Sequence, residues 1–502
     1  MKTVFSIFIT ATFILAASHL SGQNLRVKSN NGTAYVLKLE GVNLANIRIE
    51  EIPDTIGIPA HLRVLAVTKP SPESNIRISV AVPKKNWNKR FVGLGNGGEG
   101  GKLDTLLTKY IQLGYAAAHT DLGTAPGARL AVDKPGVWTD FGFRATHEMT
   151  VVAKAVIEAY KAQKPDYSYF IGCSTGGQQG LREAQDFPDD YDGILVGAPA
   201  NNRTHLHTMF VYNDKVLNTN PSNGFTLENL TAAQQAIIAA NVGKDGGYPG
   251  DDFLTDPSMA VFRPSMVEGL LNAEQIDLLQ QVYKGPRNPR TGESIYTGFP
   301  IGTETWLKDY IGKVGIRRFF FPFNWVFGSN FKATDFDFDV DMAAVDNKLS
   351  LILNANNPDL SVFRKLGGKI IMYHGLADAL VPYQDALSYY KRVIEATGSL
   401  DQTQGFFRFF LVPGCGHCSG GNGINDFGQG IAASDADSQT GIFAALVNWV
   451  ENDVAPEQIT GAGTRAGAQF RRPIYPYPLF PHYIEGKDWR LPSSYQPVEH
   501  RK

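Results

Sequence analysis

The sequence has few cysteines, no excess of charge of one sign and no long apolar run in its interior. Its 502 residues include 3 cysteines, 47 Lys and Arg, and 49 Asp and Glu, which gives a formal net charge of -2. A nucleic-acid partner needs a positive field that this balance does not build, so we expect no nucleic-acid binding. No stretch after the N-terminal segment is long and apolar enough to span a bilayer, so we expect no membrane partner.

The N-terminal segment has the pattern of a signal peptide. Met1 and Lys2 give a positive start, residues 4–17 are almost wholly apolar, and residues 18–23 are small and polar. This order predicts a signal peptide over residues 1–22 and a secreted or periplasmic protein. A buried first helix or a membrane anchor is the alternative, but the apolar run is too short to span a bilayer comfortably.

The remaining sequence has the composition of a globular protein with a large core, because 43% of the residues are hydrophobic and 19% are charged. Strands are predicted at 77–82, 90–94, 167–171, 192–196, 369–373 and 406–412, and helices at 144–162, 176–187, 383–396 and 440–450. This alternation predicts an α/β fold with a mostly parallel sheet flanked by helices, built from residues 23–203 and 351–502.

Residues 204–350 break the alternation. They mix helices, predicted at 228–240 and 272–282, with long irregular stretches. We expect them to form an inserted domain that caps the sheet. The Pro- and Tyr-rich segment 471–483 is expected to wrap the surface.

The pentapeptide at 172–176, Gly-Cys-Ser-Thr-Gly, matches G-x-S-x-G between a predicted strand and a predicted helix. A sharp strand-to-helix turn exposes the serine, and the flanking glycines relieve the crowding of that turn. The context predicts that Ser174 is a catalytic nucleophile.

A serine nucleophile needs a base, and the base needs an orienting carboxylate. In α/β-hydrolases the chain order is Ser, Asp or Glu, then His. Asp378 and His417 follow two predicted strands in that order, so we predict them as the acid and the base. Asp378 as a helix N-cap and His374 as a rival base are the alternatives, although His374 precedes the Asp and breaks the order. His147 is assigned to a helix surface or the core.

The cysteines flank the predicted site. Cys173 precedes the nucleophile and Cys418 follows the base, so a formed triad brings the two close enough to consider a disulfide. Cys415 is then left as a buried free thiol. The sequence Cys415-Gly-His-Cys418 also matches the C-x-x-C redox pattern, but a loop follows it instead of a helix. A zinc site is disfavoured because no second Cys pair completes it.

A Gly-rich loop, residues 95–101, follows the strand predicted at 90–94. Its spacing does not fit a phosphate-binding P-loop. It is expected to be either a flexible turn or an oxyanion loop.

Several segments resemble the tannase and feruloyl esterase family: residues 87–101, 144–200, 374–382 and 412–421. The resemblance implies an α/β-hydrolase core with a lid domain inserted after the nucleophile helix, and a disulfide between Cys173 and Cys418. It also implies an oxyanion hole formed by the backbone N–H groups of Thr175 and Gly98. The family acts on esters of ferulic acid, of gallic acid and of terephthalic acid (the mono-hydroxyethyl ester).

The sequence departs from the family pattern in the lid. The lid contains no cysteine, and the stretch that matches the family's calcium loop, residues 241–257, keeps only Asp245 and Asp251 as candidate ligands. Calcium takes six to eight oxygens, so the resemblance leaves a structural calcium open. Gln178 stands where the family usually has Arg. No cofactor is expected for the reaction itself.

Together these features predict a secreted serine carboxylesterase for small-molecule esters of aromatic acids, most like a feruloyl esterase, with tannase or terephthalate monoester hydrolase as alternatives. Trp306 and the aromatic segment 319–327 are candidates for stacking on the acyl group, although the segment is at least equally expected in the core. Two rival interpretations on the same scaffold are a polyphenol- or carbohydrate-binding protein and a peptidase.

Overall fold

The computed structural model describes residues 23–28, 34–219, 224–311, 315–429 and 437–499. The predicted signal peptide lies outside these ranges. Within them, no helix is long and apolar enough to cross a membrane.

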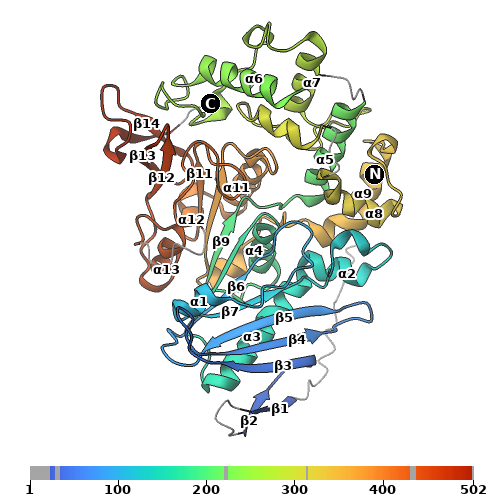
Figure 1. Ribbon diagram of the computed structural model, residues 1–502, viewed down its shortest axis with the longest axis vertical. Helices are drawn as coiled ribbons and strands as arrows, with labels where there is room; N and C mark the ends of the chain where they lie inside the picture. The colour runs from blue at the N-terminus through green and yellow to red at the C-terminus, as the bar shows by residue number, and fades with distance from the viewer. Residues whose placement is uncertain (1–22, 29–33, 220–223, 312–314, 430–436, 500–502) are drawn as a thin grey trace, which may run out of the picture.

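A nine-stranded sheet forms the centre of the molecule (Figure 1), with the strand order β11-β10-β9-β8-β6-β7-β5-β4-β3. The strands from β11 to β7 in this order are parallel, whereas β5, β4 and β3 join antiparallel at the other edge. The strands are β3 (Ala45–Ile52), β4 (His61–Thr68), β5 (Ile76–Pro83), β6 (Arg90–Leu94), β7 (Ala116–Thr120), β8 (Tyr167–Cys173), β9 (Gly193–Gly197), β10 (Lys369–Gly375) and β11 (Phe407–Val412). The predicted α/β fold with a mostly parallel sheet is confirmed.

Helices cover both faces of the sheet. Successive side chains along the central strands therefore point into two different apolar cores. Phe170, Ile194 and Met372 belong to one apolar core, and their neighbours Tyr169, Leu195 and Ile371 belong to another. Contacts with the strands are made by α1 (Thr108–Gln112), α3 (Ala145–Lys161), α4 (Thr175–Asp186), α11 (Tyr383–Thr397) and α13 (Ile442–Asn452). The short helix α12 (Leu400–Gln404) contacts β11. Another short helix, α2 (Pro135–Thr139), precedes a π-helical turn, Asp140–Arg144, that leads into α3.

The chain between β9 and β10 contributes no strand to the sheet among its described residues. Its helices are α5 (Arg203–Asn218), α6 (Leu227–Asn241), α7 (Ala273–Lys284), α8 (Phe321–Phe327), α9 (Val340–Leu353) and α10 (Ser361–Lys365). Figure 1 shows α5, α6 and α7 on the side of the molecule opposite to β3–β5. We call the segment 204–350 the lid.

Gln178 joins the lid to the sheet layers. Its side chain is fully buried on α4, and its Nε2 donates hydrogen bonds to the carbonyls of Gly142 and Leu353. Leu353 ends α9. The glutamine that departs from the family pattern therefore ties α4 to the end of the last lid helix.

The segment 319–327 is mostly core. Phe321, Phe323 and Trp325 are buried, and the Trp325 ring stacks on Trp138 at 5.5 Å between centroids. Phe319 is the member that also approaches the Gly-rich loop, since a Cβ added to Gly98 would lie 3.8 Å from Phe319 Cε1.

The C-terminal segment is more ordered than predicted. It forms two antiparallel hairpins, β12 (Ile459–Arg465) with β13 (Ala468–Ile474), and β14 (Leu479–Tyr483) with β15 (Tyr495–Glu499). A further hairpin, β1 (Gln23–Lys28) with β2 (Ala34–Leu39), lies at the other end of the chain. Ile474, Tyr475 and Phe480 are buried, so the expectation that residues 471–483 wrap the surface is wrong.

Candidate active site

Ser174 lies at a strained turn between β8 and α4. Its backbone has φ 64° and ψ -116°, a conformation that residues with a Cβ rarely adopt. The turn is tight enough to require glycine at its base, because a Cβ at Gly172 would overlap with the carbonyl oxygen of Gly176. This is the local geometry that the G-x-S-x-G pattern predicts.

Asp378 and His417 meet at the carboxyl ends of β10 and β11. His417 Nδ1 lies 2.7 Å from Asp378 Oδ2, and the Asp378 side chain is completely buried. The other carboxylate oxygen, Oδ1, accepts hydrogen bonds from the N–H groups of Leu380 and Val381. The carboxylate is therefore fixed, and it holds the imidazole by one nitrogen so that Nε2 remains for another partner.

Asp378 is held in its charged form. Burial alone would raise its pKa, but the charge of His417 and the hydrogen bonds from His374 and His417 together hold the pKa of Asp378 well below its usual range. His374 is itself fully buried, with Nε2 2.6 Å from the carbonyl oxygen of Val381 and 3.4 Å from Asp378 Oδ2. His374, the alternative base, is therefore a buried residue that stabilises the charge of Asp378.

A disulfide joins the loops that carry Ser174 and His417. Cys173 and Cys418 are bonded, with their Cα atoms 6.0 Å apart. The residues next to them in sequence, Ser174 and His417, are thereby brought together. In the described part of the chain no hydrogen bond joins Ser174 Oγ to His417, and such bonds are often looser in a free enzyme than in its substrate complex.

Cys415 remains as a buried thiol beside this disulfide. Burial raises its pKa to about 12, and the nearby Asp378 charge acts in the same direction. A thiol redox site needs the opposite, an accessible cysteine with a lowered pKa. With Cys418 bonded to Cys173, the C-x-x-C pattern does not act as a dithiol here.

Thr175 and Gly98 face each other across the turn. Thr175 Oγ1 donates a hydrogen bond of 2.7 Å to the Gly98 carbonyl, and Gly98 has φ +57°. Among the contacts of the described residues, neither the Thr175 nor the Gly98 backbone N–H donates to a protein acceptor. Both N–H groups are therefore available to an anion near Ser174.

A cavity of about 240 Å³ opens beside His417. Trp306, on a 3-10 turn of the lid, is one of its aromatic walls and Phe253 is another. Polar side chains line much of the rest: Gln234, Asp252, Thr303, Thr305, Ser419 and Asn422. Apart from Trp306, these residues were missed from the sequence, because they come from separate loops whose proximity only the fold creates.

Asp245 and Asp251 do not fit a calcium site. Both oxygens of Asp251 bind the guanidinium of Arg472, at 2.5 and 2.8 Å. The oxygens of Asp245 accept N–H groups of the loop itself, including those of Gly247 and Thr255. The buried Arg472 therefore neutralises the Asp251 charge that a divalent cation would otherwise neutralise. The sequence did not show this role, because Arg472 lies 221 residues from Asp251.

Comparisons with known proteins bear on this site. A family model described as tannase and feruloyl esterase matches residues 62–498. The chain belongs to the tannase and feruloyl esterase family. It is therefore a carboxylic ester hydrolase.

Two relatives are similar to this chain over most of their length. An uncharacterized esterase of Xanthomonas campestris pv. campestris is 32% identical over 84% of this chain and 81% of its own. A probable feruloyl esterase B-1 of Neosartorya fischeri is 31% identical over 80% of this chain and 79% of its own.

Solved structures of the family share the fold. The crystal structure of feruloyl esterase B from Aspergillus oryzae has a TM-score of 0.81 and 25% identity, covering 91% of this chain and 96% of that chain. Tannin acyl hydrolase from Aspergillus niger has a TM-score of 0.73 at 19% identity, covering 90% of each chain, and supports the fold alone.

Proposed function

We propose that this chain hydrolyses esters of aromatic acids by two-step acyl transfer, with Ser174 as nucleophile, His417 as base and Asp378 as the group that orients the base. The observation that carries the proposal is the 2.7 Å bond from His417 to the buried Asp378, next to the disulfide that joins the His417 and Ser174 loops. The relatives named feruloyl esterase support hydroxycinnamoyl esters as the first substrates to test.

The chemistry uses side chains and backbone groups of the protein together with one water molecule. Ser174 Oγ attacks the ester carbonyl and its proton passes to His417, while Asp378 stabilises the imidazolium. The N–H groups of Thr175 and Gly98 donate hydrogen bonds to the oxyanion. The first N–H groups of α4 also favour the negative charge, because they lie at a helix N-terminus. His417 then protonates the leaving alcohol, and water releases the acid by the reverse sequence.

The lid places aromatic side chains near the predicted position of the acyl group. We propose that Trp306, which lines the cavity beside His417, stacks on the aromatic acyl group. Phe319, close to Gly98, is a second candidate wall. Neither position by itself selects a ferulate over a gallate or a terephthalate.

A substrate panel tests the proposal. We expect release of acid from methyl ferulate, methyl gallate or the mono-hydroxyethyl ester of terephthalate, with loss of that activity in Ser174→Ala and no loss in Ser361→Ala, a surface serine of α10. Turnover by Ser174→Ala equal to that of the wild type would overturn the assignment of the nucleophile. Cleavage of peptide amides without ester hydrolysis would favour a peptidase, and binding without turnover would favour a polyphenol- or carbohydrate-binding protein.

We also propose that the chain is exported. The apolar segment 4–17 precedes a small, polar cleavage region, and a disulfide is stable in an oxidising compartment. The mature protein should begin near Gln23 when its N-terminus is sequenced from the medium or the periplasm. An unprocessed N-terminus at Met1 would contradict this.

A further inference from the structure

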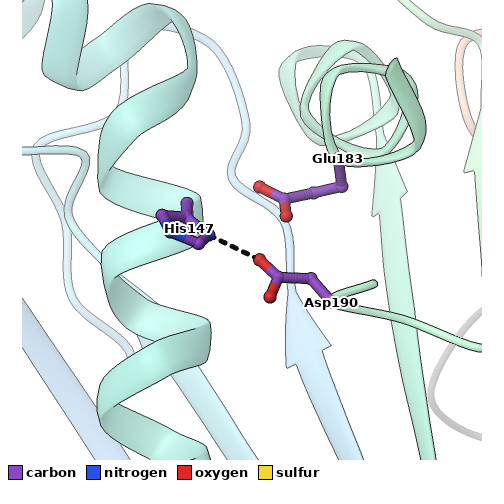
Figure 2. A group of neighbouring side chains, drawn as sticks. All are labelled: His147, Glu183 and Asp190. Atoms are coloured by element: carbon purple, nitrogen blue, oxygen red, sulfur yellow. Dashed lines mark hydrogen bonds and ion pairs between the residues drawn. The ribbon is translucent and has the colours of Figure 1, made fainter. Parts of the chain in front are cut away.

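A second cluster of chemically active side chains lies away from Ser174, between α3 and α4. Figure 2 shows His147 on α3, Glu183 on α4 and Asp190 in the turn before β9, pointing toward one another. One candidate ligand atom from each residue lies within 4.8 Å of the others. Glu183 is nine residues after Ser174 on the same helix, about 13 Å along its axis, so the cluster is separate from the candidate active site.

Glu183 is the unusual member of this cluster. It is 1% exposed, and in the described part of the chain neither of its carboxylate oxygens receives a hydrogen bond from a protein donor. A buried carboxylate with no donor is strongly unfavourable unless a cation or a proton neutralises it. The side chain therefore points to an occupant that the protein itself does not supply.

His147 and Asp190 are held in place, and His147 is open to solvent on one side. His147 Nδ1 lies 2.7 Å from Asp190 Oδ2, and the His147 ring stacks on Phe187 with centroids 3.9 Å apart. The His147 side chain is 32% exposed, which leaves a path for an ion. Stacking on Phe187 fixes the ring plane of His147 beside the Asp190 carboxylate.

Lys154 is the cation nearest to the cluster among the described contacts. Its Nζ donates to the Asp190 carbonyl oxygen at 2.6 Å and lies 4.0 Å from Asp190 Oδ1. It offsets part of the Asp190 charge and donates no hydrogen bond to Glu183. A second positive charge next to Glu183 is still required.

We propose that His147, Glu183 and Asp190 form a site for a divalent transition-metal ion that fastens α3, α4 and the turn before β9. One imidazole and two carboxylates are ligands that Zn²⁺ takes, and an imidazole favours a transition metal over Ca²⁺ or Mg²⁺. Zinc bonds of about 2.0–2.2 Å put ligand atoms about 3 to 4 Å apart, so Glu183 has only to close on the other two by a small movement. Three protein ligands leave a fourth position for water, and the distance from the ester site assigns the ion a structural role.

A proton is the alternative occupant. Burial raises the pKa of Glu183 well above its usual range, and the Asp190 charge acts in the same direction. A neutral Glu183 could then donate to Asp190 with no metal present. Metal content and stability separate the two occupants.

The experiment uses the full chain, stripped with a chelator and re-equilibrated with Zn²⁺ alone. We expect about one bound zinc per chain after gel filtration, and a higher unfolding temperature with zinc than with chelator. Glu183→Gln and His147→Gln should each weaken zinc binding by more than about tenfold, and Lys154→Gln should strengthen it by removing a competing charge. His205→Gln is the matched control, because His205 also pairs with a carboxylate, Asp346 at 2.9 Å, outside the cluster.

Several outcomes would overturn the proposal. They are a wild type that retains no zinc, a Glu183→Gln variant that retains as much zinc as the wild type, and an unfolding temperature of Glu183→Gln that equals or exceeds that of the zinc-treated wild type. The first and third support a shared proton, and the second puts the ion elsewhere. His147→Gln keeps both carboxylates, so it decides the question if Glu183→Gln fails to fold.

Discussion

At the scale of single residues, the site depends on how Asp378 is held. Its two oxygens have different partners. Oδ1 accepts hydrogen bonds from the N–H groups of Leu380 and Val381, and Oδ2 faces His417. The charge of His417 and the hydrogen bonds around the carboxylate lower its pKa against the effect of burial, so it stays charged at any pH used for ester hydrolysis. Asp378 thus acts as a fixed negative charge that sets the tautomer and orientation of His417.

Asp378→Asn tests this role. The amide keeps the shape of the carboxylate but removes the charge, so kcat should fall by about 10⁴-fold while KM changes little. Because Asp378 has a lowered pKa when folded, its contribution to stability is present above the unfolded pKa and is lost as the pH falls. The free energy of unfolding of the wild type should therefore drop in acid more steeply than that of the variant. Equal kcat values in the two proteins would contradict the role.

Trp306 is a residue-scale test of substrate choice. Trp306→Ala should raise KM for methyl ferulate more than for an acetyl ester, because an aromatic ring loses its stacking partner and a methyl group does not. Steady-state kinetics on both esters measure the difference. An equal rise for both esters would argue against stacking on the acyl group.

At the scale of helices and strands, the sequence predicts the elements that place the triad and misses those that depend on distant partners. The strand and helix around Ser174 and the strands before Asp378 and His417 are visible because apolar periodicity and the G-x-S-x-G turn are local signals. The hairpins of the C-terminal segment are not, because glycines interrupt β12 and a proline interrupts each of β13, β14 and β15. Arg472 on β13 was missed because its partner, Asp251, lies 221 residues away in the lid.

The Arg472–Asp251 pair gives a prediction for the lid loop at 241–257. Both side chains are buried and joined by two hydrogen bonds. Arg472→Met leaves the buried carboxylate with only Arg465, 3.5 Å from Asp251 Oδ1, and should lower the free energy of unfolding by about 3–5 kcal/mol. Burial already raises the pKa of Asp251, against the effect of Arg472. Without the arginine the ionised form is penalised further, so the loss should grow as pH rises.

The control for this prediction removes both charges. Arg472→Met with Asp251→Leu should recover part of the lost stability in thermal or denaturant unfolding, because no buried charge remains.

Calcium added to the chelator-treated wild type should leave its unfolding temperature unchanged. A calcium-dependent rise that Asp245→Asn abolishes would show that Asp245 and Asp251 bind the ion.

At the scale of the whole molecule, the disulfide links two cysteines 245 residues apart in sequence, with the entire lid between them. It joins the end of β8 to the loop after β11, two strands that β9 and β10 separate in the sheet. The two parts of the hydrolase core are thus connected covalently at the site. The sequence allowed this bond to be considered, but only the fold brings the two cysteines together.

Removing the disulfide tests its contribution. Replacing Cys173 and Cys418 together with Ala should lower stability by up to about 5 kcal/mol, from the loop entropy returned to the unfolded chain, and should lower esterase activity as the two loops separate. Cys415→Ala is the matched control, since it removes a buried thiol without removing a cross-link. Equal stability and activity in the two variants, measured by unfolding and by kcat/KM, would contradict the role.

The central claim is that Ser174 is activated by His417 and Asp378, and covalent labelling tests it most directly. A serine-directed phosphonate should add one label per chain, and peptide mapping should place it on Ser174, with no labelling of Ser174→Ala and slow labelling of His417→Ala. A label on another serine, or a wild type that does not react, would contradict the account.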